Sequence, residues 1–225
     1  MKKALTLAVL IVTPSIIFAQ ETVGFANNSR SLVQQWTSAY YSTPAPVPVS
    51  GGYVQLIATA KGNPLPHPLG VYGSSGFLPG YSSLAGFLAA NPGWVVPYYE
   101  YGATPSAPVP INSAPGIFKG PTDTMFPLGP GADADYVVIG WTGPYATYDA
   151  AYAADLATPN SSFLGMSASA TTQTGDPTLV NPSLPVNLKV TFQGMTLAPA
   201  VIPEPTIVLL VGLCALLLMM FRRRN

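Results

Sequence analysis

Cysteine and histidine are almost absent from this chain of 225 residues. The only cysteine is Cys214, near the C-terminus, and the only histidine is His67, which lies between two prolines. The region before Cys214 therefore has no cysteine nucleophile, thiolate metal site or disulfide, and a centre with several histidines is excluded. A Ser-His-Asp hydrolase would have to use His67, and Gly73-Ser74-Ser75-Gly76 lacks the spacing of a nucleophile elbow.

Charge is also scarce, because only 8% of the residues are charged and nine basic residues balance nine acidic ones. Residues 20–202 hold four lysine or arginine and eight aspartate or glutamate residues, a net charge of −4. A mildly acidic, charge-poor chain of this kind is not a nucleic-acid binder. The chain has 25 prolines and 21 glycines, but 12 tyrosines, 9 phenylalanines and 3 tryptophans supply enough apolar area to predict a folded core.

The N-terminus has the pattern of a secretory signal peptide. Lys2 and Lys3 form a positively charged start, and residues 4–18 form an apolar run that is short for a membrane span. We expect signal peptidase to cleave between Ala19 and Gln20, removing residues 1–19. The alternative is an uncleaved anchor.

The C-terminus combines three features in a fixed order. Pro203-Glu204-Pro205 precedes sixteen uncharged residues, 206–221, and three arginines, Arg222, Arg223 and Arg224, follow. Sixteen helical residues span roughly 24 Å, a length that suits a transmembrane helix when arginines at its end reach the interface. The arginines predict a cytoplasmic C-terminus and export of everything before the helix. The alternative is a buried helix of a soluble domain.

This tail resembles the PEP-CTERM sorting signal of exported bacterial proteins, and the match covers residues 203–225. That signal consists of a Pro-Glu-Pro motif, a hydrophobic helix and a terminal arginine cluster. The resemblance implies recognition by an exosortase, a membrane-embedded cysteine protease that cuts near the motif. It also implies an association with extracellular polysaccharide or biofilm matrix. It says nothing direct about the activity of residues 20–202, the predicted extracytoplasmic body.

The body is predicted to consist mainly of strands. Residues 23–26 are a first candidate, and residues 53–60 carry apolar Val54, Leu56 and Ala58 at a period of two. Residues 135–142 form a nearly continuous run of strand-forming residues, which is typical of a strand buried on both faces.

Residues 186–197 have the clearest alternation in the chain. Val186, Leu188, Val190 and Phe192 alternate with polar residues, and the apolar phase moves by one residue after Gly194. We expect one long strand, bulged at Gly194, whose four apolar residues point into the core and which leads into the tail.

Two short helices are predicted, one capped by Ser82 or Ser83 and ended by Asn91-Pro92-Gly93, the other running from Thr147 to about Leu156. Together with the strands, they predict a mainly β fold with a single β-sandwich-like body. Residues 136–141, 148–154 and 186–197 are similar in order to the strand, helix and last strand of other PEP-CTERM surface proteins, which supports this fold class.

The segments 45–49 and 107–111 have nearly the same alternation of proline with small or branched residues. One interpretation is an internal duplication, and the other is a pair of extended, polyproline-like connectors.

Aromatic residues gather around Glu100, where Trp94, Tyr98, Tyr99 and Tyr101 could contact carbohydrate. The alternative is that these rings pack in the core or along a strand edge. A glycosidase would also need two opposed carboxylates. The candidates are Glu100, Asp133, Asp135, Asp149, Asp155 and Asp176.

Asp133 and Asp135 follow a Gly-Pro-Gly turn two residues apart and are a weak candidate for a Ca²⁺ site. The sequence around them lacks the further ligands of an EF-hand loop, so the alternative is a solvated loop before a strand.

The main hypothesis is an exported, exosortase-sorted surface or matrix protein with a non-catalytic body, without cofactor or resident metal. Its expected partners are signal peptidase, exosortase, the membrane through residues 206–221, and exopolysaccharide. The alternative is a secreted carbohydrate-active protein, either a binding module or a glycoside hydrolase. The precursor is expected in the inner membrane and the product at the cell surface or in the matrix.

Overall fold

The computed structural model describes residues 22–36, 43–66, 81–99, 104–121, 124–125, 128–176, 179, 183–184 and 186–199. Within them the fold is mainly β, with several sheets and two short helices, as predicted. The predicted signal peptide, its cleavage site, the Pro-Glu-Pro motif and the expected transmembrane segment lie outside the described residues.

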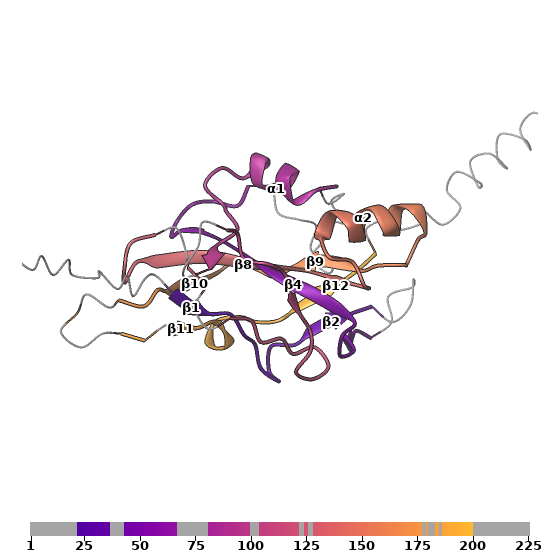
Figure 1. Cartoon of the computed structure of the whole chain (residues 1–225), viewed down its shortest axis with the longest axis horizontal. Coiled ribbons are helices and arrows are strands. Elements are labelled where there is room, and N and C mark those ends of the chain that lie inside the picture. Colours follow the sequence, from indigo (N-terminus) through magenta and orange to yellow (C-terminus); the bar gives the residue numbers. More distant parts are fainter. Residues whose placement is uncertain are drawn as a thin grey trace, which may run out of the picture.

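The centre of the molecule is a sheet built on two long antiparallel strands, β4 (Gly52–Ala60) and β8 (Asp133–Thr142), shown in Figure 1. They pair from Gly52 opposite Thr142 to Ala60 opposite Ala134. The short strand β6 (Val109–Pro110) joins the free side of β4, and β9 (Leu164–Met166) and β10 (Ala170–Gln173) follow each other along the free side of β8.

A β-bulge joins β9 to β10. Ser167 donates its backbone N–H to the carbonyl of Val138 at 2.8 Å, and its hydroxyl accepts the N–H of Val138 at 2.9 Å. The side chain thus replaces the ladder bond that the extra residue would otherwise remove. The sequence analysis did not predict these strands.

The central sheet is buried on both faces, as predicted for residues 135–142. Val54, Leu56, Ala58, Tyr136 and Val138 belong to one core cluster, whereas the residues between them, such as Ile57, Val137 and Trp141, belong to a second. This alternation follows from the period of two along a strand. Val54, Leu56 and Ala58 therefore share one face, as their spacing predicted.

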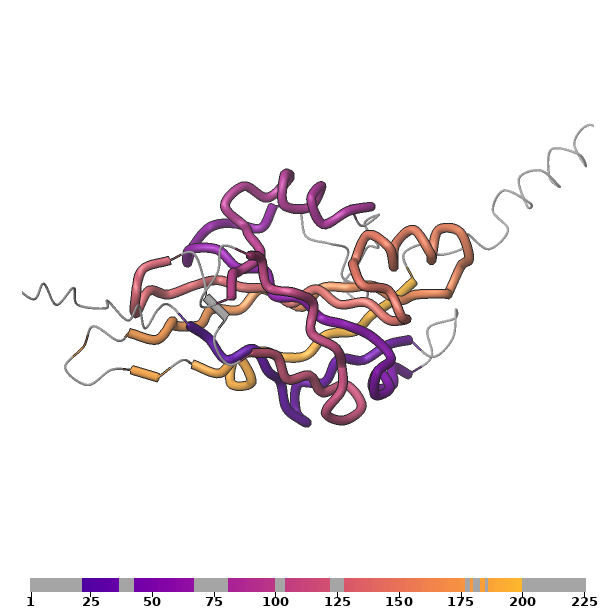
Figure 2. The backbone as a smooth tube through the Cα atoms, in the orientation of Figure 1, coloured from indigo at the N-terminus to yellow at the C-terminus, as the bar shows by residue number. Residues whose placement is uncertain are grey.

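One face is covered by strands from both ends of the described chain, and we call it the strand-covered face. β1 (Thr22–Gly24) pairs in parallel with β11 (Val186–Asn187), and β2 (Val33–Gln35) pairs in parallel with β12 (Met195–Leu197). Figure 2 shows the indigo and yellow segments running side by side. The remaining short strands of this layer are β3 (Ala45–Pro46), β5 (Tyr98–Tyr99) and β7 (Thr124–Met125).

The other face lies under the two helices, α1 (Leu84–Ala90) and α2 (Tyr148–Ala157), and we call it the helix-covered face (Figure 1). Both helix predictions are confirmed. Ser83 and Thr147 are the N-caps, and their hydroxyls accept the N–H groups of Gly86 and Ala150.

The prediction of one long strand over residues 186–197 is wrong. β11 ends at Asn187, whose side chain accepts the N–H of Lys189 and begins a 3-10 turn over Leu188–Val190. The chain becomes extended again only at β12. Leu188 and Phe192 are buried, but Val186 is only half-buried and Val190 is 71% exposed.

The pattern misled because residues four apart lie on the same side of both a strand and a single helical turn. Leu188 and Phe192 satisfy either structure, and here the N–H of Phe192 donates to the carbonyl of Leu188 at 2.8 Å. Gly194 directly precedes β12, and its φ is +86°, a conformation that favours glycine.

Two paired glycines let β12 cross close to the central sheet. Gly140 of β8 lies opposite Gly165 of β9. A Cβ atom at Gly140 would lie 2.4 Å from Cε of Met195, and one at Gly165 would lie 2.9 Å from the carbonyl oxygen of Thr196. The missing side chains make room for β12.

The two proline-rich segments each contribute a two-residue edge strand, β3 in the layer of chain-end strands and β6 in the central sheet. An edge position suits proline, which cannot donate to a ladder on its open side. This placement fits extended connectors, and it does not test the duplication.

Candidate functional site

The sorting and cleavage residues of the sequence analysis, Ala19, Gln20, Pro203–Pro205 and Arg222–Arg224, lie outside the described residues. The same holds for Tyr101, Glu100, His67 and the segment 73–76.

Trp94 lies in the core under the helices. Its side chain is 2% exposed and belongs to the same cluster as Phe87 and Trp141. The indole N–H donates to the carbonyl of Pro64 at 3.0 Å, so the polar atom of the ring is satisfied inside the protein. This arrangement favours a packing role for Trp94 over sugar contact.

The two described tyrosines of the same group lie on β5. Tyr98 is 36% exposed, whereas Tyr99 is half-buried and its hydroxyl accepts the N–H of Ala107 at 2.9 Å. Of the three described aromatic residues proposed to contact carbohydrate, only Tyr98 is therefore exposed, and its exposed fraction is about a third. The structure does not bring Trp94, Tyr98 and Tyr99 together as one exposed platform.

Asp133 and Asp135 are held by donors of the chain itself. Asp133 forms a salt bridge with Lys61 at 2.7 Å, and Asp135 accepts the N–H of Gly62 at 2.7 Å and the hydroxyl of Thr171 at 2.5 Å. The hydrogen bond and the negative charge of Asp133 raise the pKa of Lys61 above its usual value. These contacts close the turn that follows β4, which is the structural alternative to a Ca²⁺ site. Within the described ranges, no three metal-ligating side chains gather in one place.

The other described carboxylates also serve the fold. Asp149 of α2 accepts the N–H of Leu84, the first residue of α1, at 2.7 Å. Asp155 is fully buried in α2 and accepts the N–H of Ser162 at 3.5 Å. Asp176 lies beside Gly131: a Cβ atom added to Gly131 would be 2.9 Å from Oδ2 of Asp176. These candidates for a glycosidase pair thus support helix ends and loops.

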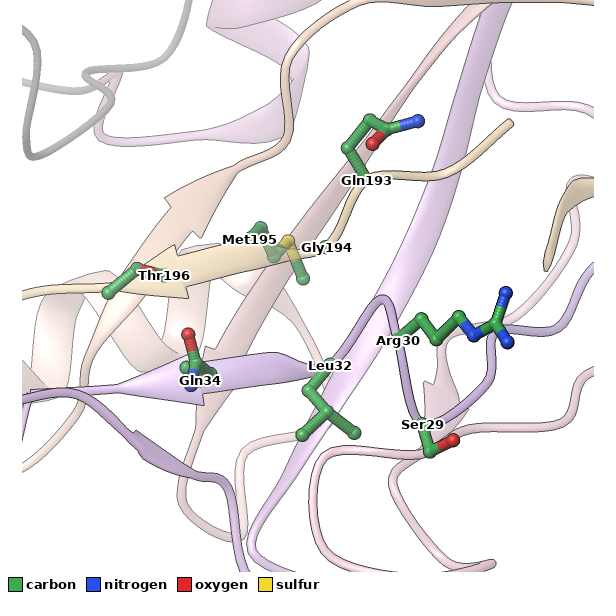
Figure 3. A pocket seen from close by; sticks show the side chains of 8 residues that line it. All are labelled: Ser29, Arg30, Leu32, Gln34, Gln193, Gly194, Met195 and Thr196. Carbon is green, nitrogen blue, oxygen red and sulfur yellow. The ribbon is translucent and has the colours of Figure 1, made fainter. Parts of the chain in front are cut away.

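A groove that the sequence analysis missed lies along the parallel strands β2 and β12 (Figure 3). Its volume is about 290 Å³. The lining residues come from β2 and the turn before it, and from β12 and the turn before it: Ser29, Arg30, Leu32, Gln34, Gln193, Gly194, Met195 and Thr196. The pairing of Gln34 with Thr196 places two polar residues side by side.

Asparagine side chains bind backbone carbonyls around the groove and fix its turns in place. The side chain of Asn28 donates to the carbonyl of Lys189 at 2.9 Å. Asn27 is buried and donates to the carbonyls of Ser31 and Gly116. A Cβ atom at Gly194 would lie 2.8 Å from the carbonyl oxygen of Leu32, so the glycine allows the turns to touch. The groove is therefore a fixed part of the fold.

The polar side chains of the groove are open to a ligand. Within the described part of the chain, the side chains of Ser29, Arg30, Gln34 and Thr196 make no hydrogen bond, and the amide of Gln193 contacts only the nearby carbonyl of Thr191 at 3.3 Å.

Sequence reasoning missed this site because the two halves are about 160 residues apart and meet only through the parallel pairing. The only signal is that Gln34 and Thr196 are polar residues within strands.

In the portion of the chain that the structure covers, no helix has both the length and the apolar character needed to cross a membrane. Comparisons with models of protein families, with curated proteins and with solved structures gave no match.

Proposed function

We propose that this chain is an exported surface or extracellular-matrix protein that is sorted by an exosortase and whose body is non-catalytic. The observation that carries the proposal is the tail, in which Pro203-Glu204-Pro205, the uncharged residues 206–221 and the arginines 222–224 follow one another. A signal-peptide pattern at residues 1–19 supports the same direction of export.

The place where the described body ends is consistent with this function. β12 pairs with β2, and the buried residues Leu197 and Ala198 lie only a few positions before Pro203. From Pro199 to Pro203, an extended chain covers at most about 14 Å. While the tail is in the membrane, the body would stay close to the membrane surface, and cleavage near Glu204 would release it or transfer it to an acceptor.

The body itself is proposed to be a β-sandwich-like unit, in which the layer of chain-end strands packs on the central sheet. A carbohydrate-active role through Trp94, Tyr98 and Tyr99 has less support, because Trp94 is buried and Tyr99 is half-buried. The structural roles of Asp133, Asp135, Asp149 and Asp155 likewise favour a non-catalytic body.

The test is the mass of the protein in cells with and without the exosortase. We expect a smaller product only when the exosortase is present, and we expect Glu204→Ala to leave the precursor uncut, because the protease would lose its recognition motif. Glu100→Ala, which removes the same charge outside the motif, is the matched control and should be cut normally. Equal masses that include the tail would show a plain membrane anchor.

Export is tested separately by sequencing the N-terminus of the same protein. Gln20 is the expected first residue, and Met1 would show that the N-terminal segment stays attached.

A further inference from the structure

We infer that the groove between β2 and β12 binds an acidic polysaccharide, with Arg30 pairing with the carboxylate of a uronic-acid unit. Four cations lie in the described residues, and only Lys61 has an ion-pair partner there. Of the other three, Arg30 lies in the turn of residues 26–31, and the backbones of Lys119 and Lys189 contact that turn. We call these three residues the basic cluster.

The backbone attaches each member of the basic cluster to this turn. Lys119 lies opposite Ala26 in an antiparallel bridge, and the carbonyl of Lys189 accepts the side chain of Asn28. Arg30 belongs to the turn itself and lines the groove (Figure 3). All three residues are exposed. None of the described carboxylates pairs with them, although residues 20–202 carry a net charge of −4.

The neutral part of the groove suits a sugar. Gln34 and Gln193 offer amide donors and acceptors, and Ser29 and Thr196 offer hydroxyls, so the site can match the hydroxyl groups of a saccharide ring. Arginine adds the planar fork that binds carboxylate in two parallel hydrogen bonds. The groove lies along two strands of three residues each, so it can hold a short part of a polymer while the rest stays in solvent.

The charge of the whole body decides between kinds of polyanion. A nucleic acid has a high charge density and needs many cations, whereas here three cations stand on an acidic protein. A polysaccharide with one carboxylate per sugar unit needs fewer neutralising contacts per unit length. This inference rests on the proposed function, because an exported matrix protein is one that meets such polymers.

The experiment measures binding of the full-length protein in detergent to polygalacturonate, with neutral dextran and a DNA duplex as comparison polymers. We expect binding to polygalacturonate that weakens as salt is added, and none to dextran. Arg30→Ala should weaken this binding about tenfold, because an arginine–carboxylate pair is lost. Arg30→Lys should keep part of it, because the charge remains without the fork.

Lys61→Ala is the matched control, because it changes the net charge by the same amount away from the groove. Its affinity for polygalacturonate should equal that of the unchanged protein. Thr196→Val keeps the shape of the side chain and should weaken binding by a few fold through the lost hydroxyl.

Three results would overturn the inference. They are the absence of binding to polygalacturonate, equal losses for Arg30→Ala and Lys61→Ala, and DNA binding as tight as polygalacturonate binding. The mass test of sorting is independent of the groove. If Arg30→Ala is cut normally and no variant binds the polymer, the inference fails and the proposed function stands; if the tail is never cut, the proposed function fails whatever the polymer does.

Discussion

The two faces of the central sheet are buried in different ways. On the helix-covered face, large side chains such as Phe87, Trp94 and Tyr148 fill the space between the sheet and α1 or α2. On the strand-covered face, β12 approaches so closely that a Cβ atom at Gly140 would meet the side chain of Met195 and one at Gly165 would meet the backbone of Thr196. A helix is about 10 Å wide and keeps its axis away from the sheet, whereas a crossing strand can come into backbone contact.

The faces also differ in where their residues lie in the sequence. The helix-covered face is closed by segments that precede or directly follow β8, whereas the strand-covered face needs residues 22–36 and 186–199 together. Contacts between such distant segments form only after a large loss of chain entropy. We therefore expect the strand-covered face to depend on the whole body being present, and the following predictions examine this difference.

The largest effect is expected at Phe192, which is 3% exposed and packs against Phe118 with ring centroids 5.9 Å apart. Phe192→Ala should lower the free energy of unfolding by about 3–5 kcal/mol, because it leaves a cavity in the strand-covered face. Val190→Ala is the matched control in the same turn, and because Val190 is 71% exposed it should change stability by less than about 0.5 kcal/mol. Denaturant unfolding measures both, and similar losses would mean that residues 186–192 form the strand first predicted.

The glycine pair comes next. Gly165→Ala should cost about 1–3 kcal/mol, because the new methyl group would meet the backbone carbonyl of Thr196, which cannot move aside. Gly140→Ala should cost less, because the atom it meets is the flexible end of Met195.

A double-mutant cycle sharpens this pair of predictions. Met195→Ala should reduce the cost of Gly140→Ala and leave that of Gly165→Ala unchanged, as measured by denaturant unfolding. If Met195→Ala relieved neither substitution, the close approach of β12 at Gly140 would be contradicted.

A smaller effect is expected on the helix-covered face. Asp149 of α2 accepts the N–H of Leu84 at the start of α1, so Asp149→Ala should cost about 1 kcal/mol, a typical value for a lost helix cap. Asp149→Asn keeps an acceptor and should cost less. Thermal unfolding of the two variants tests the contact, and identical melting temperatures for Ala and Asn would argue against it.

The dependence of stability on alkaline pH tests one buried tyrosine on each face of the central sheet. Burial raises the pKa of Tyr136 to about 12 and also raises that of Tyr148. Between pH 10 and 12 the unfolded chain loses the Tyr136 proton while the folded chain keeps it, so stability is fully present below pH 10 and falls as the pH rises.

Tyr136→Phe should reduce the loss of folding stability between pH 10 and 12. The double variant Tyr136→Phe with Tyr148→Phe should reduce this loss further. At neutral pH, Tyr136→Phe should cost about 1 kcal/mol, because its hydroxyl is within hydrogen-bond distance of Thr191 at 2.8 Å. Unfolding curves from pH 8 to 12 give the comparison, and an unchanged slope in the double variant would show that other groups cause the fall.

Much of the local structure could be predicted because it depends on neighbouring residues. The first helix was predicted to be capped by Ser82 or Ser83 and the second to begin at Thr147, and the N-caps are Ser83 and Thr147. The nearly continuous run of strand-forming residues 135–142 indicated burial on both faces. The groove could not be predicted, because its two halves are about 160 residues apart. The strand β9 depends on its pairing with β8, and the exposure of Val190 depends on a turn that imitates strand periodicity.

The sequence by itself determined that the strand over residues 135–142 is buried on both faces, where the helices begin and end, and the two terminal patterns from which export and sorting are proposed. Those features rest on periodicity, capping and composition, which act over a few residues. Only the tertiary structure decided that Asp133 and Asp135 are held by Lys61, Gly62 and Thr171, that Trp94 is buried, and that Gln34 and Thr196 meet in a groove beside Arg30. These arrangements follow from how distant strands pair, because the pairing of β1 with β11 and of β2 with β12 brings together side chains that no local pattern connects.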